Sequence, residues 1–504
     1  MSAPTASPDA DRTMSTARIV GALAAMILLS EIATFEILMV LPALPHMAAE
    51  FQTTDVAWVV SIVTLTGATV MPLVGKASDK WGKKRVIMIL AGGFVLGSVV
   101  SATAPTLALM LVGRAMQGAL VGIVSISYGL VRDTFPRRIV PVALGAVVTG
   151  IGMSAVASPF IAGWIIDGVG FRGIFLFMAA YVLVLLPIYA VMVPESPVRV
   201  RRAVDYLGTA LLGPGIAVLL LGLTVGSRWG WTSPATLAAL VLGTVMLGSF
   251  VAWQRVCPHP LIDLKILLGP RFGPAILAVS CVSYMMNAHA LIIPTMLQTP
   301  AGIPGITYGS GLSATQLAFW TFPVGVVSMI MGPVGGYLAR KIGARQVLIA
   351  ATVTLLAVMY LGSRLFTVHW QVAAMSSLCG LGIGLLHSSN ANLIQDALPP
   401  SQGGVGNSIG GMGVLLAGGI ATTLTGVVMS NHVLTVTAGS HVIYSDTGLT
   451  RGYLFAALAG ALGLIVALVM RHGRSPAQGG MTEIVDPSTM SPESSTSMAG
   501  HRSS

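Results

Sequence analysis

The stretch GKASDKWGKKR, residues 75–85, connects two long apolar segments, and a second version of it, GYLARKIGAR, occupies residues 336–345. Glycines align at both ends of the two versions, and basic residues follow the second glycine. Such a repeat predicts two pseudo-symmetric halves with a site between them. Because glycine permits tight turns, we expect a gating loop in each half; the alternative is a basic loop with no further role. The loop residues are Gly75, Asp79, Gly82, Lys83, Lys84 and Arg85, and Gly336, Arg340, Gly343 and Arg345.

The composition is that of a membrane-embedded chain, with 54% apolar residues, 9% charged residues and a mean hydropathy of +0.85. A soluble domain carries about 25% charged residues, so this chain lacks the charge that a bilayer excludes. Windows of about 19 residues predict fourteen transmembrane helices. The predicted spans are residues 19–41, 55–75, 86–104, 107–130, 141–165, 173–193, 206–226, 234–254, 274–297, 313–338, 346–366, 370–394, 405–429 and 452–470.

We therefore expect an all-α polytopic membrane protein. Two six-helix bundles are predicted at residues 19–195 and 274–470, with two additional helices at 206–254 between them. The tails, residues 1–18 and 475–504, are rich in small and polar residues and cannot bury a core. We expect both tails to be disordered.

The net charge of +10 predicts an orientation rather than a nucleic-acid partner. Most of the 27 Lys and Arg residues fall on the side of the termini, and only Arg172, Arg228, Arg364 and Arg451 fall opposite. The positive-inside rule then places both termini in the cytoplasm. We expect a multi-pass protein of the cytoplasmic (inner) membrane, with residues 430–450 as its longest external loop.

A carboxylate lies where lipid is expected. Glu36 is in the first apolar segment, and Glu31 precedes it by five residues. An ionisable residue at that depth marks a transport path, a proton relay or a bound cation. Burial disfavours the charged form of a carboxyl, so Glu36 can exchange a proton or pair with a cationic substrate; the alternatives are snorkelling or a permanent ion pair. Glu31 faces elsewhere, because five residues turn a helix by about 140°.

Arg114 is the basic residue placed well inside a span, where an unpaired guanidinium is untenable. Its candidate partner is Glu36 or Glu31, and Gln117, one turn on, can bond toward the same cavity. A pair that substrate binding separates would couple a proton to transport, whereas the alternative is a static buried pair. Further polar candidates for the cavity are Asn287, His289, His387 and Asn390, although a lone histidine in a membrane is more often a hydrogen-bonded packing residue.

The sequence favours neither an enzyme nor a metal site. It holds no nucleotide-binding loop of the G-x-x-x-x-G-K-[ST] type and no H-E-x-x-H zinc motif. Its three cysteines form no C-x-x-C pair. We therefore predict no cofactor and no metal.

Several motifs carry a family resemblance, which covers about residues 19–470. Residues 75–85 resemble the signature loop of the major facilitator superfamily, and GRAMQG, residues 113–118, is similar to its R-x-x-Q-G motif. FEILMVLPALP, residues 35–45, resembles the first-helix motif of the fourteen-span drug/proton antiporters, with glutamate where aspartate is usual. The fifth span resembles the antiporter motif, but with small residues replacing three glycines. The matching positions are Gly145, Ser154, Ser158, Pro159, Ala162 and Gly163.

This resemblance implies the major facilitator fold and proton-coupled export of amphipathic organic compounds by alternating access. It implies that Glu36, Arg114, Glu31 and Gln117 serve proton coupling or substrate binding. The implied partners of a monomer are a small-molecule substrate, protons and membrane lipid. Two alternatives remain open: a proton-coupled transporter of an endogenous metabolite or lipid, and a non-transporting membrane receptor or assembly factor.

Overall fold

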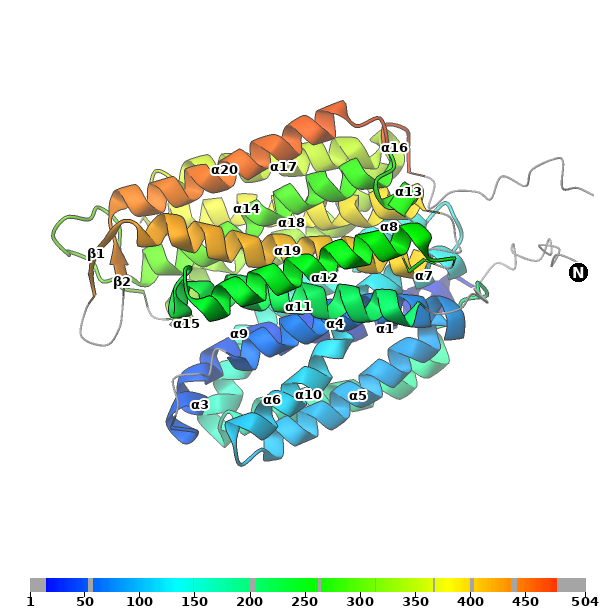
Figure 1. Ribbon diagram of the computed structural model, residues 1–504, viewed down its shortest axis with the longest axis horizontal. Helices are drawn as coiled ribbons and strands as arrows, with labels where there is room; N and C mark the ends of the chain where they lie inside the picture. Colours follow the sequence, from blue (N-terminus) through cyan, green and yellow to red (C-terminus); the bar gives the residue numbers. More distant parts are fainter. Residues whose placement is uncertain are drawn as a thin grey trace, which may run out of the picture.

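The computed structural model describes residues 15–52, 58–147, 149–199, 205–258, 260–261, 264–312, 314–365, 368–398, 403–436 and 442–477. Within them, thirteen helices are long and apolar enough to cross a membrane, or up to fourteen when a pair bent by 49° within α4 counts as one span. The predicted all-α polytopic fold is confirmed (Figure 1).

The first predicted spans are not all continuous helices. The first breaks at Glu31, and the fourth contains a 3-10 turn, η4 (Ala119–Gly122). The helices up to Met192 are α1 (Thr16–Ser30), α2 (Ile32–Leu38), α3 (Leu44–Glu50), α4 (Trp58–Trp81), α5 (Lys83–Thr103), α6 (Leu107–Gly118), α7 (Ile123–Thr134), α8 (Val140–Val147), α9 (Thr149–Val169) and α10 (Arg172–Met192), with the 3-10 turn η2 (Leu41–Ala43) before α3.

In the part of the chain after Met192 that the structure describes, the regular elements are helices and one hairpin in the predicted external segment, where β1 (Val433–Val436) pairs antiparallel with β2 (Val442–Tyr444). The remaining helices are α11 (Tyr206–Trp229), α12 (Pro234–Val256), α13 (Leu264–Leu267), α14 (Phe272–Gln298), α15 (Ala314–Thr321), α16 (Pro323–Ile342), α17 (Ala344–Gly362), α18 (His369–Ala397), α19 (Gly403–Ser430) and α20 (Asp446–Val469). In Figure 1 the hairpin lies at the end opposite the start of α1 and the end of α20.

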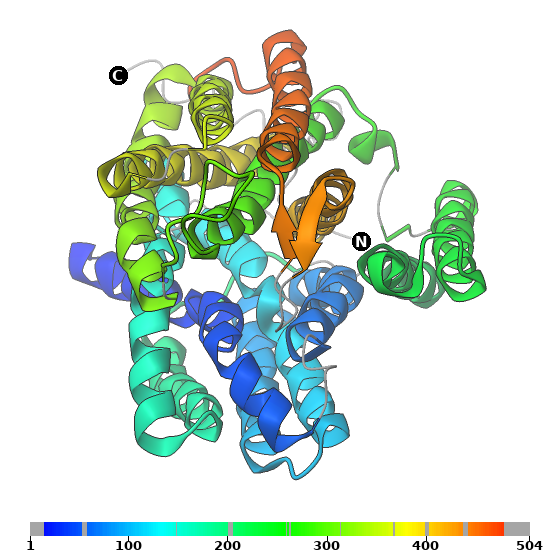
Figure 2. The same cartoon turned by 90° about the vertical axis from the view of Figure 1, so that its left-hand side faces the viewer.

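Buried apolar side chains form two large clusters. One draws on residues 22–193 with Ala391, and the other on residues 275–477. A smaller cluster joins α11 to α4 and α19 through Met71, Leu212 and Met412. In Figure 2, α11 and α12 (green) lie at the edge of the molecule, with α12 outermost. This arrangement supports two bundles, with α11 and α12 as two additional helices beside them. The domain boundaries stay a prediction.

The repeated stretches are helical, and the prediction of loops is wrong for most of their residues. Gly75 and Asp79 lie in α4, and Gly336 lies in α16. Only the second glycine of each stretch turns the chain, with φ of +108° at Gly82 and +96° at Gly343. Gly336 serves close packing instead, because an added methyl would overlap the Pro141 carbonyl of α8.

Both tails are shorter than predicted. Helix α1 begins at Thr16, and the Ser15 hydroxyl accepts a hydrogen bond from the Arg18 backbone N–H at 3.4 Å, which caps the first turn. At the other end, the Ala477 backbone N–H donates to the Ala339 carbonyl at 3.0 Å. The predicted disorder of residues 1–14 and 478–504 lies outside the described residues.

Candidate functional site

Glu36 and Arg114 meet in the interior of the first bundle. Glu36 comes from α2 and Arg114 from α6, and both side chains are fully buried. Arg114 Nη1 lies 3.8 Å from Glu36 Oε1, so the two charges are close without a direct hydrogen bond between them. Gln117 lies beside this pair and accepts from Arg114 Nη1 at 2.7 Å. The structure thus brings together three of the four residues that the sequence assigned to proton coupling.

Neutral acceptors hold the Arg114 guanidinium in place. Nε donates to the Val59 carbonyl at 2.9 Å, Nη1 to Gln117, and Nη2 to the backbone carbonyl of Glu36 at 2.9 Å. Gln117 in turn donates to Ser98 Oγ at 2.6 Å. The guanidinium therefore stays positioned whether or not the Glu36 carboxyl is charged.

The Glu36 carboxyl itself has few partners. Both of its oxygens are buried and accept no hydrogen bond from any residue that the structure describes. The carboxyl can gain or lose a proton, or bind a cation, without breaking the contacts that fix Arg114. This combination of a fixed cation and an acid without hydrogen bonds suits a proton-exchange site.

Glu31 does not join this pair. Its carboxyl faces α10, where Tyr181 Oη lies 3.0 Å from Glu31 Oε2, while its backbone carbonyl accepts from Ser154 Oγ of α9 at 3.4 Å. The different direction agrees with the helical angle between residues 31 and 36. Tyr181 was missed by sequence reasoning, because a tyrosine in an apolar span carries no distinguishing signal.

The antiporter-like motif packs helices together. Helix α8 packs against α16 where Gly145 meets the Gly332 backbone. Within α9, the Ser158 hydroxyl donates to the Ser154 carbonyl. Ala162 is fully buried. Gly163 has open space around it, and the side chain of Pro159 lies outside the described residues. Small residues here allow close approach between α8 or α9 and neighbouring helices.

Gly145→Ala is expected to disrupt folding or transport, because an added methyl would overlap the Gly332 backbone carbonyl and push α8 away from α16. Gly163→Ala is the matched control within the same motif, since nothing lies within 4 Å of its added methyl. Yield of monodisperse protein and transport rate measure the effect. Equal behaviour of the two variants would contradict this packing role.

The Asp79 stretch forms a buried ion cluster. Lys83 Nζ lies 3.2 Å from Asp79 and 2.8 Å from Asp133 of α7, with all three side chains at most 5% exposed. Asp133 was missed because a charge at the end of a span looks like an ordinary loop charge. In the second stretch, Arg340 stands at the position of Asp79 and is exposed, so the charge pattern of the cluster is specific to the first half.

Two hydrogen bonds from Arg132, which neighbours Asp133 of the ion cluster, join α7 to α18. Arg132 of α7 donates to Gln395 Oε1 at 3.2 Å and to the Leu398 carbonyl at 2.7 Å, where α18 ends. A cation at a helix C-terminus is stabilising, and this one joins α7 to a helix of the second apolar cluster.

The two stretches share one further contact. Lys84 donates to the Ala190 carbonyl near the end of α10, and Arg345 donates to the Ala467 and Leu468 carbonyls near the end of α20. The last helix of each half is thus bound in the same way, which supports a structural repeat.

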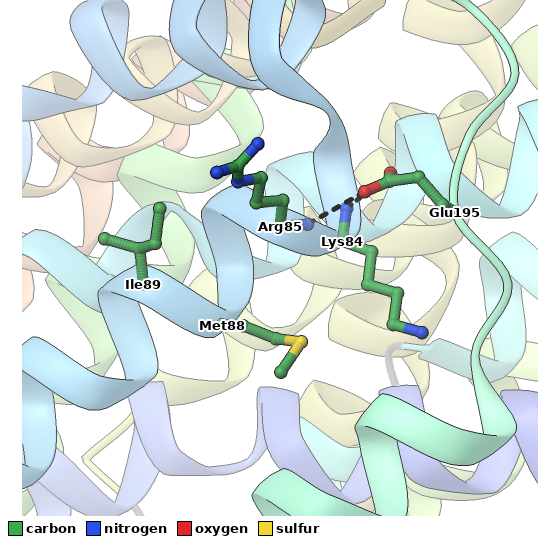
Figure 3. A pocket seen from close by; sticks show the side chains of 5 residues that line it. All are labelled: Lys84, Arg85, Met88, Ile89 and Glu195. Atoms are coloured by element: carbon green, nitrogen blue, oxygen red, sulfur yellow. Dashed lines mark hydrogen bonds between the residues drawn. The ribbon is translucent and has the colours of Figure 1, made fainter.

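A pocket of about 460 Å³ opens at the start of α5 and is lined by Lys84, Arg85, Met88, Ile89 and Glu195 (Figure 3). The Glu195 carboxylate accepts from the backbone N–H groups of Lys84 at 3.0 Å and Arg85 at 3.1 Å. A side chain of the protein thus already fills the anion position at this helix N-terminus.

The polar candidates of the second half have no described contact with Glu36. His289 is buried beside Tyr453, with 3.4 Å between Nδ1 and Oη, and Asn287 donates to the Ser283 carbonyl in its own helix. His387 and Asn390 lie on α18, and the Asn390 amide oxygen is buried without a described partner. Among the described residues, no hydrogen bond or ion pair joins any two of these four.

A Gly-x-Ser-x-Gly spacing occurs at residues 406–410 but lies inside α19. A nucleophile of that pattern requires a sharp strand-to-helix turn, so this stretch is not a hydrolase site.

The family model of the Major Facilitator Superfamily matches residues 26–422. The chain belongs to the major facilitator superfamily. The multidrug resistance protein B homolog of Mycobacterium tuberculosis is 27% identical over 451 residues, which cover 84% of this chain and 80% of the relative. The probable actinorhodin transporter of Streptomyces coelicolor is 26% identical over 343 residues, which cover 66% of this chain and 58% of that relative.

Solved structures share the major facilitator fold. The proton:xylose symporter XylE has a TM-score of 0.64 at 13% identity, covering 92% of this chain and 99% of that chain. The human organic anion transporter MFSD10 has a TM-score of 0.59 at 15% identity, covering 90% of this chain and 100% of that one. At these identities the likeness concerns the fold alone. Family and relatives together make the chain a multi-pass membrane transporter rather than an enzyme.

Proposed function

We propose that this transporter exports amphipathic organic compounds in exchange for protons, by alternating access. The observation that carries the proposal is the Glu36 carboxyl, which is buried, accepts no hydrogen bond from any described residue, and lies beside an Arg114 that neutral groups hold in place. Relatives named for multidrug resistance support the substrate class. In this scheme a proton and a substrate compete for the Glu36 carboxyl, and their exchange drives export.

The direct test uses purified protein in vesicles with an imposed pH gradient. Adding candidate drugs should produce drug-dependent proton movement in the direction opposite to the drug. Proton movement in the same direction as the substrate would favour a symporter of a metabolite or lipid. No substrate-dependent flux with any compound class would favour a receptor or an assembly factor.

The ion cluster of Asp79, Lys83 and Asp133 is proposed to gate the transporter rather than to bind substrate. Asp79→Ala removes one of two carboxylates from a buried lysine, so the packing of α4, α5 and α7 at this end should weaken. Transport should slow while equilibrium substrate affinity stays within a few-fold of the parent value. Glu50→Gln is the matched control, because it breaks an ion pair with Arg172 in which the Glu50 side chain is 52% exposed and should change little. Lost binding with an intact fold would refute the gating role.

Both termini are proposed to be cytoplasmic, because basic residues concentrate on their side. In a background without the native cysteines, Ser440→Cys should react with an impermeant thiol reagent added to intact cells. Labelling only after lysis would reverse the orientation. A monomer in the inner membrane, with lipid and a small-molecule substrate as partners, completes the proposal.

A further inference from the structure

Glu31 is a buried acid with no cation beside it. Its side chain lies in the first span and is 4% exposed, and no ion pair among the described residues includes it. The helices packed against α1 and α2 contribute one titratable group within hydrogen-bond distance of its carboxyl, which is Tyr181. The other charged or titratable residues described on α7 to α10 are Tyr128, Arg132, Asp133, Asp167, Arg172 and Tyr189, and none of these has a described contact with Glu31.

Tyr181 contacts two oxygen acceptors with a single hydroxyl proton. Its Oη lies 2.8 Å from the Leu28 carbonyl and 3.0 Å from Glu31 Oε2. One O–H group can donate to only one of them in a full hydrogen bond. Both short contacts are full two-centre hydrogen bonds only if a second proton is present, and the Glu31 carboxyl is the group that can carry it.

We propose that Glu31 carries a proton in this conformation, donates it to Tyr181 Oη, and thereby forms the chain Glu31 to Tyr181 to the Leu28 carbonyl. Phe35 and Phe177 pack on the tyrosine ring at centroid distances of 5.4 Å and 6.1 Å and fix its position. Tyr181 is accordingly a positioning residue. When the proton leaves for water, Tyr181 turns its hydroxyl to the carboxylate, and the Leu28 carbonyl no longer accepts from Tyr181.

This step rests on the proposed function, because it makes Glu31 the carrier of a second transported proton. Helix α9 packs closely against both Glu31 and the second half. A methyl group added to Gly150 of α9 would lie 2.9 Å from Glu31 Cγ, and a methyl group added to Gly152 would lie 2.6 Å from the Gly325 carbonyl oxygen of α16. Helix α9 thus touches the Glu31 turn and the second half within three residues. We expect release of the Glu31 proton to accompany movement of α9 along α16, and not substrate binding at Glu36.

Infrared difference spectroscopy on purified protein tests the protonation without any transport assay. In a Glu36→Gln background at neutral pH, the C=O stretch of a protonated carboxyl should be present, and adding Glu31→Gln should remove it. Tyr181→Phe keeps the ring packing but removes the acceptor oxygen, so the band should persist at a shifted frequency. An unchanged spectrum on adding Glu31→Gln, in protein that remains folded, would overturn the assignment.

The second test counts protons per substrate molecule in vesicles. Glu31→Gln with an intact Glu36 should move one proton fewer per substrate than the parent, at a measurable transport rate. An unchanged count would overturn the role of Glu31 as a carrier, even with the infrared band present. If the parent protein moves no protons with substrate, the proposed function fails while the infrared result still decides the protonation of Glu31.

Discussion

Glu36→Gln is expected to fold like the parent protein and to lose gradient-driven export completely. The amide nearly matches the carboxyl in shape, and Arg114 keeps its bonds to Val59, Gln117 and the residue 36 backbone carbonyl. The fold should therefore survive, whereas an amide cannot release a proton. Thermal unfolding in detergent measures whether the fold survives, and drug efflux from energised vesicles measures whether export is lost.

Glu36→Asp is the control for this variant. It keeps a titratable carboxyl one methylene shorter, so part of the export activity should remain. Full gradient-driven export by Glu36→Gln would show that the coupled proton travels elsewhere, and Glu31 would then be the first residue to test.

Arg114→Met should be the most destabilising single change at the site. It removes three hydrogen bonds from buried acceptors and leaves Glu36 without a cation. Removing one partner from a buried charged network typically costs about 3–5 kcal/mol. The free energy or midpoint of unfolding in detergent should fall clearly below that of Glu36→Gln.

The double variant separates two explanations for that loss. If Arg114 mainly balanced the Glu36 charge, adding Glu36→Gln to Arg114→Met would restore most of the stability. Because the guanidinium bonds to neutral groups, we expect the double variant to recover only a small part. Near-complete recovery would mean that a static ion pair, rather than a fixed cation beside an exchangeable acid, describes the site.

The sequence predicted the parts of the site that break the apolar pattern. Glu36 and Arg114 are conspicuous because charge is rare inside spans, and their contact follows from the need to pair a buried guanidinium. Gly82 and Gly343 were also predictable, since a turn between two helices favours glycine at positive φ.

Other parts depend on contacts between distant residues, which a single sequence does not reveal. Tyr181 lies 150 positions from Glu31, and Asp133 reaches Lys83 only because α7 packs beside α5. The loop expectation for residues 75–81 was wrong because hydropathy marks where lipid ends and not where a helix ends. Helix α4 continues past the apolar stretch to Trp81.

Proton exchange at Glu36 is measured most directly as proton release by purified protein in weakly buffered detergent solution when a transported drug is added. The parent protein should release protons on binding, Glu31→Gln should still do so, and Glu36→Gln should release none while still folded. Release by Glu36→Gln equal to that of the parent would contradict the assignment of Glu36 as the site where substrate and proton exchange.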